Sequence, residues 1–120
     1  AIGHLGSMVA PEVEVHKAIC ERGAFVGFDR QGGRSDDRNV PMVLKLLDAG
    51  YADRLLISAD FGVNAWTNWQ QNGGPGISRA LTVFAPKLLQ AGVSEETLRG
   101  ILEHNSRRFL ACLPKIPRTV

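Results

Sequence analysis

The sequence has 120 residues, of which 44% are apolar, so it is long enough for one domain with a buried core. Its formal net charge of +2 comes from interspersed acidic and basic residues, which excludes the basic block typical of proteins that bind nucleic acid or an anionic membrane. No apolar run approaches the roughly 20 residues of a membrane span, and the first residues lack the pattern of a secretory signal.

The first half of the chain predicts alternating strands and helices. A short strand ends at His4, and a helix over 11–22 begins with proline and stops at Gly23. The next strand, 24–29, is rich in Phe and Val and shows no polar alternation, which suits a parallel strand buried on both faces. The inward face of the predicted helix over 11–22 consists of Val15, Ala18 and Ile19.

A second strand and helix unit follows. After a polar loop over 30–38, four apolar residues at helical spacing predict an amphipathic helix that Gly50 ends: Val40, Val43, Leu44 and Leu47. The strand 54–60 comes next and ends at Asp60. The repeat of 30 to 40 residues has the size of a βαβ module.

The remaining residues predict helices. After a loop over 61–77, one helix carries an apolar stripe that Pro86 should kink or break: Leu81, Phe84, Ala85, Leu88 and Leu89. Ser94 is a credible N-cap for a helix that runs to about Glu103. Asn105 is predicted to cap a last turn.

Three side chains that can bind a metal or transfer a proton stand where predicted strands end: His4, Asp29 and Asp60. In parallel α/β folds, catalytic and metal-binding groups project from the carboxyl ends of strands. Two structural alternatives remain open. Asp60 can instead cap a helix or order a loop, and Asp29 can either support a neighbouring ligand or pair with Arg30 or Arg34.

The fold class follows from the number of units. Three parallel strands leave an open sheet with two exposed edges, and eight units take about 250 residues to close a barrel. We therefore predict an α/β fold in which residues 1–120 form the C-terminal part of a single (β/α)8 TIM-barrel domain.

Several segments, in order and spacing, resemble the phosphotriesterase family of the amidohydrolase superfamily. Residues 2–6, 23–30 and 46–60 are similar to its last three barrel strands, six to eight. The first contains Gly3-His4, the second ends in Phe-Asp-Arg and the third ends in Ser-Ala-Asp. Residues 93–98 and 105–110 resemble its final helices. The resemblance covers essentially the whole chain.

The resemblance implies a binuclear metal-dependent hydrolase. The family's strand-six His binds one divalent metal, and its strand-eight Asp binds the other and contacts a bridging hydroxide; these positions match His4 and Asp60. Two divalent ions are expected, with zinc first, because imidazole and carboxylate are suitable ligands. Asp60 would also be catalytic, by accepting the proton of the attacking hydroxide.

The same resemblance bears on the substrate, a small molecule. An Arg directly after the strand-seven Asp, here Arg30, resembles the lactonase-like branch, and its guanidinium is expected either to bind a substrate oxygen or to order the loop. Lactones and phosphotriesters are the predicted substrates. Trp66 and Trp69 either line the substrate pocket or cap the barrel mouth. One departure concerns the proton relay, because Ser7 and Met8 stand where family members commonly carry an acidic pair.

The family's other ligands would lie upstream of Ala1, so the isolated chain is expected to be inactive. The alternative is a non-catalytic half-barrel that self-associates as a homo-oligomer or pairs with a missing N-terminal part. A further alternative concerns residues 1–7, because Gly-Ser before Met8 resembles a cloning remnant.

The other titratable residues are predicted to be structural. His16 and His104 lie among charged neighbours in helices and are expected on the solvated surface. Cys20 and Cys112 are far apart and outside any Cys-x-x-Cys spacing, which indicates reduced thiols and a cytoplasmic protein.

Overall fold

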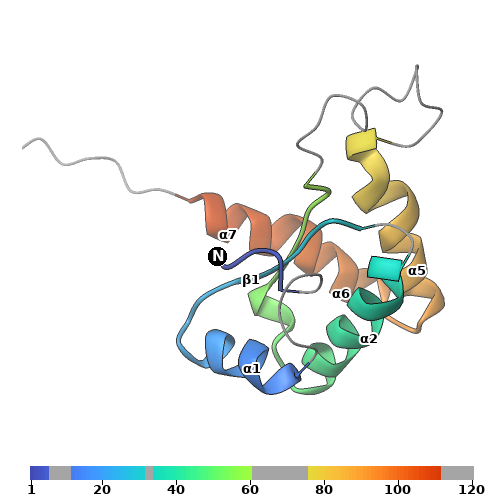
Figure 1. Cartoon of the computed structure of the whole chain (residues 1–120). Helices are drawn as coiled ribbons and strands as arrows, with labels where there is room; N and C mark the ends of the chain where they lie inside the picture. The colour runs from blue at the N-terminus through green and yellow to red at the C-terminus, as the bar shows by residue number, and fades with distance from the viewer. Residues whose placement is uncertain (6–11, 32–33, 61–75, 112–120) are drawn as a thin grey trace, which may run out of the picture.

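The computed structural model describes residues 1–5, 12–31, 34–60 and 76–111. Short strands alternate with helices in the first half of the chain, and the described elements after them are helical (Figure 1). Within these residues no helix is both long and apolar enough to cross a bilayer. In chain order the elements are α1 (Val13–Glu21), β1 (Val26–Phe28), α2 (Arg34–Asp48), η1 (Ala52–Arg54), β2 (Leu55–Ile57), η2 (Gly76–Ser78), η3 (Ala80–Phe84), α5 (Ala85–Gln90), α6 (Glu95–Arg99), η4 (Gly100–Asn105) and α7 (Ser106–Leu110).

Three chain segments lie side by side in sequence order and run parallel. Strands β1 and β2 pair with Val26 opposite Leu55, and Ile2 forms a parallel bridge with Val26 on the other side of β1. The Ile2 N–H donates to the Phe25 carbonyl at 2.8 Å. The predicted parallel order is confirmed, but the strands are shorter than 24–29 and 54–60, partly because Ala52–Arg54 forms the 3-10 turn η1.

One contiguous core joins the strands to the helices. Val26 and Phe28 of β1 and Leu55 of β2 are fully buried. The helices that pack on them contribute Val43, Leu46, Phe84, Leu88 and Ile101, all fully buried as well. This core fixes the direction in which each strand leaves the sheet, and so it positions the residues that follow the strands.

The helix around Pro86 changes its winding. Residues 80–84 form the π turn η3, in which the Ala85 N–H donates to the carbonyl of Ala80, five residues back. Pro86 then stands in the first turn of α5, where a missing N–H costs least. The helical run continues through Pro86, so the predicted break is wrong, and the winding changes from π to α just before that residue.

The predicted apolar stripe of this helix is only partly correct. Phe84, Ala85 and Leu88 are buried, but Leu81 and Leu89 are 60% and 39% exposed. In the π turn Ala80 is buried in place of Leu81, and Leu89 follows Leu88 by about 100° of helical rotation. Periodicity reasoning assumed uniform α winding and therefore assigned both leucines to the wrong face.

The start of α2 corrects the predicted loop over 30–38. The helix begins at Arg34, with Asp36 and Asp37 in its first turn, where carboxylates interact favourably with the helix dipole. Its predicted end is confirmed, because Gly50 takes a φ of 85° and its N–H donates to the Leu47 carbonyl at 2.9 Å.

Two cap predictions have different outcomes. The Ser94 cap is confirmed, since its Oγ accepts a hydrogen bond from the Thr97 N–H at 3.1 Å. The Asn105 cap is wrong, because α6, η4 and α7 form one helical run through that residue. Its buried amide instead donates to the carbonyls of Ala52 (2.7 Å) and Leu55 (2.9 Å), which ties the run to the start of β2.

The predicted inward face of helix α1 is only partly correct, since Ile19 is half-buried and packs against the core. His16 is fully buried and Cys20, one turn later, is also buried, whereas Val15 is 40% exposed. The surface prediction for His16 is therefore wrong, while His104 is exposed as predicted. Burial raises the pKa of the Cys20 thiol, which fits a reduced core cysteine; Cys112 lies outside the described residues.

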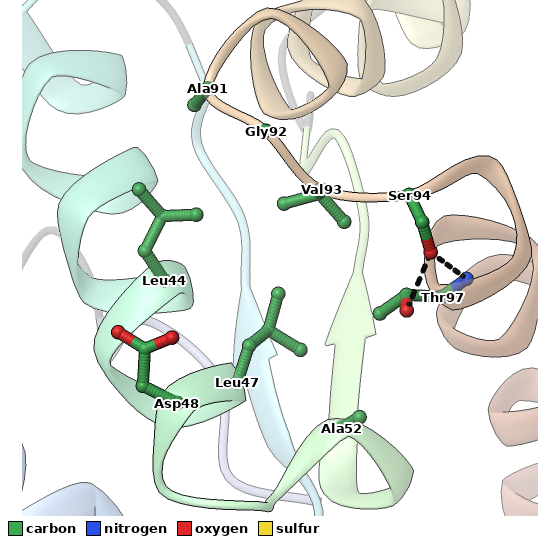
Figure 2. A pocket seen from close by; sticks show the side chains of 9 residues that line it. All are labelled: Leu44, Leu47, Asp48, Ala52, Ala91, Gly92, Val93, Ser94 and Thr97. Atoms are coloured by element: carbon green, nitrogen blue, oxygen red, sulfur yellow. Dashed lines mark hydrogen bonds between the residues drawn. The ribbon is translucent and has the colours of Figure 1, made fainter.

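A groove of about 510 Å³ lies between the C-terminal half of α2 and the 91–94 turn (Figure 2). Leu44 and Leu47 line one side, Val93 and Thr97 the other, and Ala52 its end. None of the residues lining this groove follows a strand. The groove therefore lies away from the strand-end residues considered next.

Candidate metal centre

The structure brings His4, Asp29 and Asp60 together, as their strand-end positions predict. One ligand atom from each residue can be chosen so that all three atoms lie within 4.8 Å of one another. The packing of Ile2, β1 and β2 side by side explains this, because adjacent parallel segments release their following residues at the same edge.

The backbone at this edge is conformationally strained. Among the described residues, the non-glycine residues with positive φ are His4 (61°), Arg30 (53°) and Asp60 (48°). The left-handed region costs an L-residue roughly 1–2 kcal/mol, so it persists where surrounding contacts impose it. His4 and Asp60 belong to the three-residue group, and Arg30 directly follows its third member, Asp29, which points to a functional constraint at this edge.

Asp29 holds His4 through two contacts. Its Oδ2 accepts a hydrogen bond from the His4 backbone N–H at 2.9 Å, and its Oδ1 lies 3.0 Å from His4 Nδ1. Gly3 leaves room for this carboxylate, since a Cβ at that position would lie 3.0 Å from Asp29 Oδ2. A carboxylate on one ring nitrogen fixes the tautomer and leaves the other nitrogen free to bind a metal.

Asp60 forms a partly exposed ion pair. Its Oδ2 accepts from Arg30 Nε at 2.9 Å and lies 3.6 Å from His4 Nδ1. The side chains of Arg30 and Asp60 are 51% and 36% exposed, so their attraction is screened and contributes at most about 1 kcal/mol. A divalent cation can therefore compete with the guanidinium for this carboxylate at low cost.

A buried polar network supports the loop that carries Arg30. Asp36 is buried and pairs with Lys87 Nζ at 2.6 Å and with Arg79 at 3.3 Å. Arg79 also donates from Nε to the Gln31 carbonyl at 3.1 Å. Sequence reasoning missed this network, because no periodicity or motif relates Asp36 to cations more than 40 residues away.

The donor set fits a divalent transition metal. Imidazole nitrogen and carboxylate oxygen are the ligands that zinc and similar ions take in proteins, and these three residues offer both. Ligands from this part of the chain alone would leave coordination positions for other ligands. Trp66, Trp69, Ser7 and Met8 lie outside the described residues, so their predicted roles stay predictions.

Sequence comparison identifies relatives of this chain. The model of the phosphotriesterase family matches residues 1–110, which include His4. The phosphotriesterase homology protein of Escherichia coli (strain K12) is 33% identical over 94 residues, covering 76% of this chain and 32% of that protein. The aryldialkylphosphatase of Saccharolobus solfataricus is 28% identical over 120 residues, covering 92% and 38%. Human N-acetyltaurine hydrolase is 33% identical over 75 residues, covering 62% and 21%.

Solved structures of TIM-barrel proteins share the fold. The phosphotriesterase homology protein from Escherichia coli, complexed with phosphate in its active site, superposes with a TM-score of 0.74 at 28% identity over 88% of this chain and 36% of its own. An amidohydrolase from Mycoplasma synoviae gives 0.81 at 28% identity over 96% and 34%. This chain thus spans about a third of the length of these neighbours. It belongs to the phosphotriesterase family of metal-dependent hydrolases.

Proposed function

We propose that this chain supplies strands six to eight of a (β/α)8 hydrolase that cleaves lactones or phosphotriesters with two divalent metal ions. The observation that carries the proposal is the meeting of His4, Asp29 and Asp60 at one edge of three parallel segments. In barrels of this class the strand ends carry the chemistry, whereas the opposite face serves stability. The relatives, about three times longer than the matched segment, would contain the remaining ligands.

The metal-binding roles divide between two residues. His4 binds one ion through the ring nitrogen that Asp29 does not occupy, and Asp60 binds the other through its carboxylate. Zinc is the expected metal. When bound, such ions polarise a carbonyl or phosphoryl oxygen and lower the pKa of water toward neutrality.

The protein groups then move the proton and orient the substrate. Asp60 accepts the proton that the attacking water loses, because its exposed carboxylate faces the same edge as His4. Arg30 places its guanidinium beside Asp60 at the same edge, where it would hold a substrate oxygen. Asp29 stays with His4 and holds the ring in place.

The substrate class rests on Arg30 and on the relatives. The names of the relatives include an aryldialkylphosphatase and an N-acetyltaurine hydrolase, which indicates cleavage of a phosphotriester and of an amide within the family. Arg30 favours lactones, because an Arg directly after Asp29 resembles the lactonase-like branch of the family and its guanidinium would hold a substrate oxygen. Lactones and phosphotriesters share an electrophilic centre with a polarised oxygen, so one site can serve both.

The proposal is tested on the intact protein that contains this sequence. Zinc-loaded protein is assayed with an aryl dialkyl phosphotriester, a δ-lactone and N-acetyltaurine, before and after removal of metal by a chelator. We expect turnover of the lactone or the phosphotriester, its loss with the metal, and its return with added zinc. Turnover that survives metal removal would refute a metal-dependent mechanism, and turnover of N-acetyltaurine alone would refute the substrate class.

A non-catalytic half-barrel is the second candidate, and exposed apolar surface at the sheet edge favours it. Ile2 is 45% exposed beside β1, and among the described residues β2 has no strand on its far side. Open edges of this kind pair with other chains. The homo-oligomer, the missing partner segment and the cytoplasmic location stay predictions.

The isolated 120-residue chain tests whether ligands from outside this sequence are needed for metal binding. We expect it to associate in size-exclusion chromatography and to hold less than one zinc ion per chain, because His4 and Asp60 alone cannot complete two coordination shells. A folded mutant of the chain with both residues changed to alanine is the control for nonspecific zinc. A monomer with two tightly bound ions would contradict this expectation.

A further inference from the structure

His16 is a fully buried residue that the proposed function leaves without a role. Its Nε2 lies 3.1 Å from the carbonyl oxygen of Leu5, and its Nδ1 lies 3.2 Å from that of Glu12. Its ring stacks on Phe28, with the centroids 6.0 Å apart and the planes 11° from parallel. Leu5 follows His4 directly and Phe28 precedes Asp29, so one ring contacts the neighbours of two cluster residues.

The hydrogen bonds of His16 define which nitrogen carries a proton. Both of its partners are carbonyl oxygens, which only accept, and a neutral imidazole has a single N–H. The Glu12 carbonyl already accepts from the Val15 N–H at 3.3 Å. Within the described residues, the Leu5 carbonyl has His16 as its donor. The proton therefore satisfies the structure best on Nε2, directed at Leu5.

This hydrogen bond acts on a strained turn. His4 has a φ of 61°, and the chain leaves the sheet there. Asp29 fixes the backbone N–H of His4 on one side of the residue, and His16 fixes the carbonyl of Leu5 on the other. With both ends held, the His4 ring keeps one direction relative to Asp29 and Asp60.

We propose that His16 is a positioning residue for the metal centre. Its Nε2–H holds the turn after His4. Its ring stacks on Phe28, which precedes Asp29, and so fixes the position of that turn relative to Asp29. The proposal rests on the proposed role of His4 as a ligand. Loss of the His16 side chain loosens the ligand His4 rather than the core, so metal affinity falls while the fold persists.

The test compares variants of the intact protein with zinc as the probe. His16→Phe keeps a flat ring over Phe28 but removes both nitrogens, and His16→Gln restores a donor without the ring. We expect His16→Phe to lower zinc affinity by about 10- to 100-fold in competition with a chromophoric chelator, and His16→Gln to recover part of it. His104 is exposed, so His104→Gln is the matched control, and we expect its zinc affinity to be unchanged.

Two readouts separate positioning from general damage. The cobalt-substituted His16→Phe protein should show altered visible absorption while its far-ultraviolet circular dichroism matches the unchanged protein. A folded His16→Phe variant with affinity within about twofold of the unchanged protein would overturn the proposal, because that lies well below the loss expected of a ligand-supporting group. If His4→Ala and Asp60→Ala also leave zinc affinity unchanged, the proposed function itself fails.

A measurement on the unchanged protein covers the case in which His16→Phe does not fold. Nitrogen-15 NMR of the imidazole rings identifies which nitrogen carries hydrogen. We expect a protonated Nε2 on His16, with slow hydrogen exchange because the ring is fully buried. A neutral ring protonated on Nδ1 would overturn the proposal, since Leu5 would then lack its donor.

Discussion

Asp60→Asn in the intact, zinc-loaded protein is expected to lower kcat/KM by at least about 10³-fold, because an amide neither accepts the proton nor binds a cation as a carboxylate does. The side chain keeps its size, and asparagine tolerates the left-handed backbone that Asp60 adopts (φ 48°). The fold is therefore retained, and the loss reports on chemistry. His4→Ala is expected to act on the same step by removing a ligand, with zinc content falling in parallel.

The matched control is Asp53→Asn, which makes the same change just before β2 rather than after it. Asp53 is 53% exposed and pairs with Arg54 and Arg108 at the surface. We expect its kcat/KM to stay within about twofold of the unchanged protein, because exposed ion pairs contribute little to structure. Steady-state hydrolysis and zinc analysis of the purified variants measure both effects. Asp60→Asn activity equal to that of the control would exclude Asp60 as the catalytic carboxylate.

Asp36→Asn is expected to destabilise the protein by about 2–4 kcal/mol, since it removes the charge from a buried carboxylate that two cations share. Asp36 is 1% exposed, whereas Arg79 and Lys87 are 20% and 39% exposed. The cations can therefore recover some hydration, which keeps the loss below that of a fully buried pair. The amide also cannot accept from both cations as strongly as the carboxylate does.

Urea unfolding of the intact protein measures this effect through the shift of the midpoint at constant slope. The neighbouring Asp37 is exposed and gives the control Asp37→Asn, which should change stability by no more than about 0.5 kcal/mol. The contrast between adjacent aspartates isolates burial from helix-dipole effects, because both lie in the first turn of α2. Equal midpoints for the two variants would show that the Asp36 network contributes nothing to stability.

The cluster could be predicted from sequence because strand ends are a local property. Apolar runs end where the chain leaves the core, and His4, Asp29 and Asp60 each stand at such a point. Parallel order then brings the three points to one edge without any knowledge of side-chain packing. Their distances and the two contacts between Asp29 and His4 depend on the paired geometry of β1 and its neighbours, which no single segment encodes.

The errors arose where tertiary partners override local pattern. The polar character of His16 predicts a surface position. Two backbone carbonyls and the Phe28 ring instead make its burial favourable. Asn105 is predicted to cap a helix because asparagine is common at N-caps. The carbonyls of Ala52 and Leu55, at the start of β2, instead accept hydrogen bonds from its side-chain amide. The π winding of η3, directly before Pro86, is likewise not indicated by the apolar period of the sequence.

The left-handed backbone of His4, Arg30 and Asp60 makes this edge vulnerable in protein engineering. Glycine adopts this backbone conformation with less strain than the residues present. Glycine substitutions at these positions can therefore raise the free energy of unfolding by up to about 1 kcal/mol each. A screen that rewards heat resistance alone would therefore enrich such substitutions and discard the ligand, the guanidinium and the carboxylate together. Stabilising libraries for this protein should hold the three positions fixed and draw their gains from the helices.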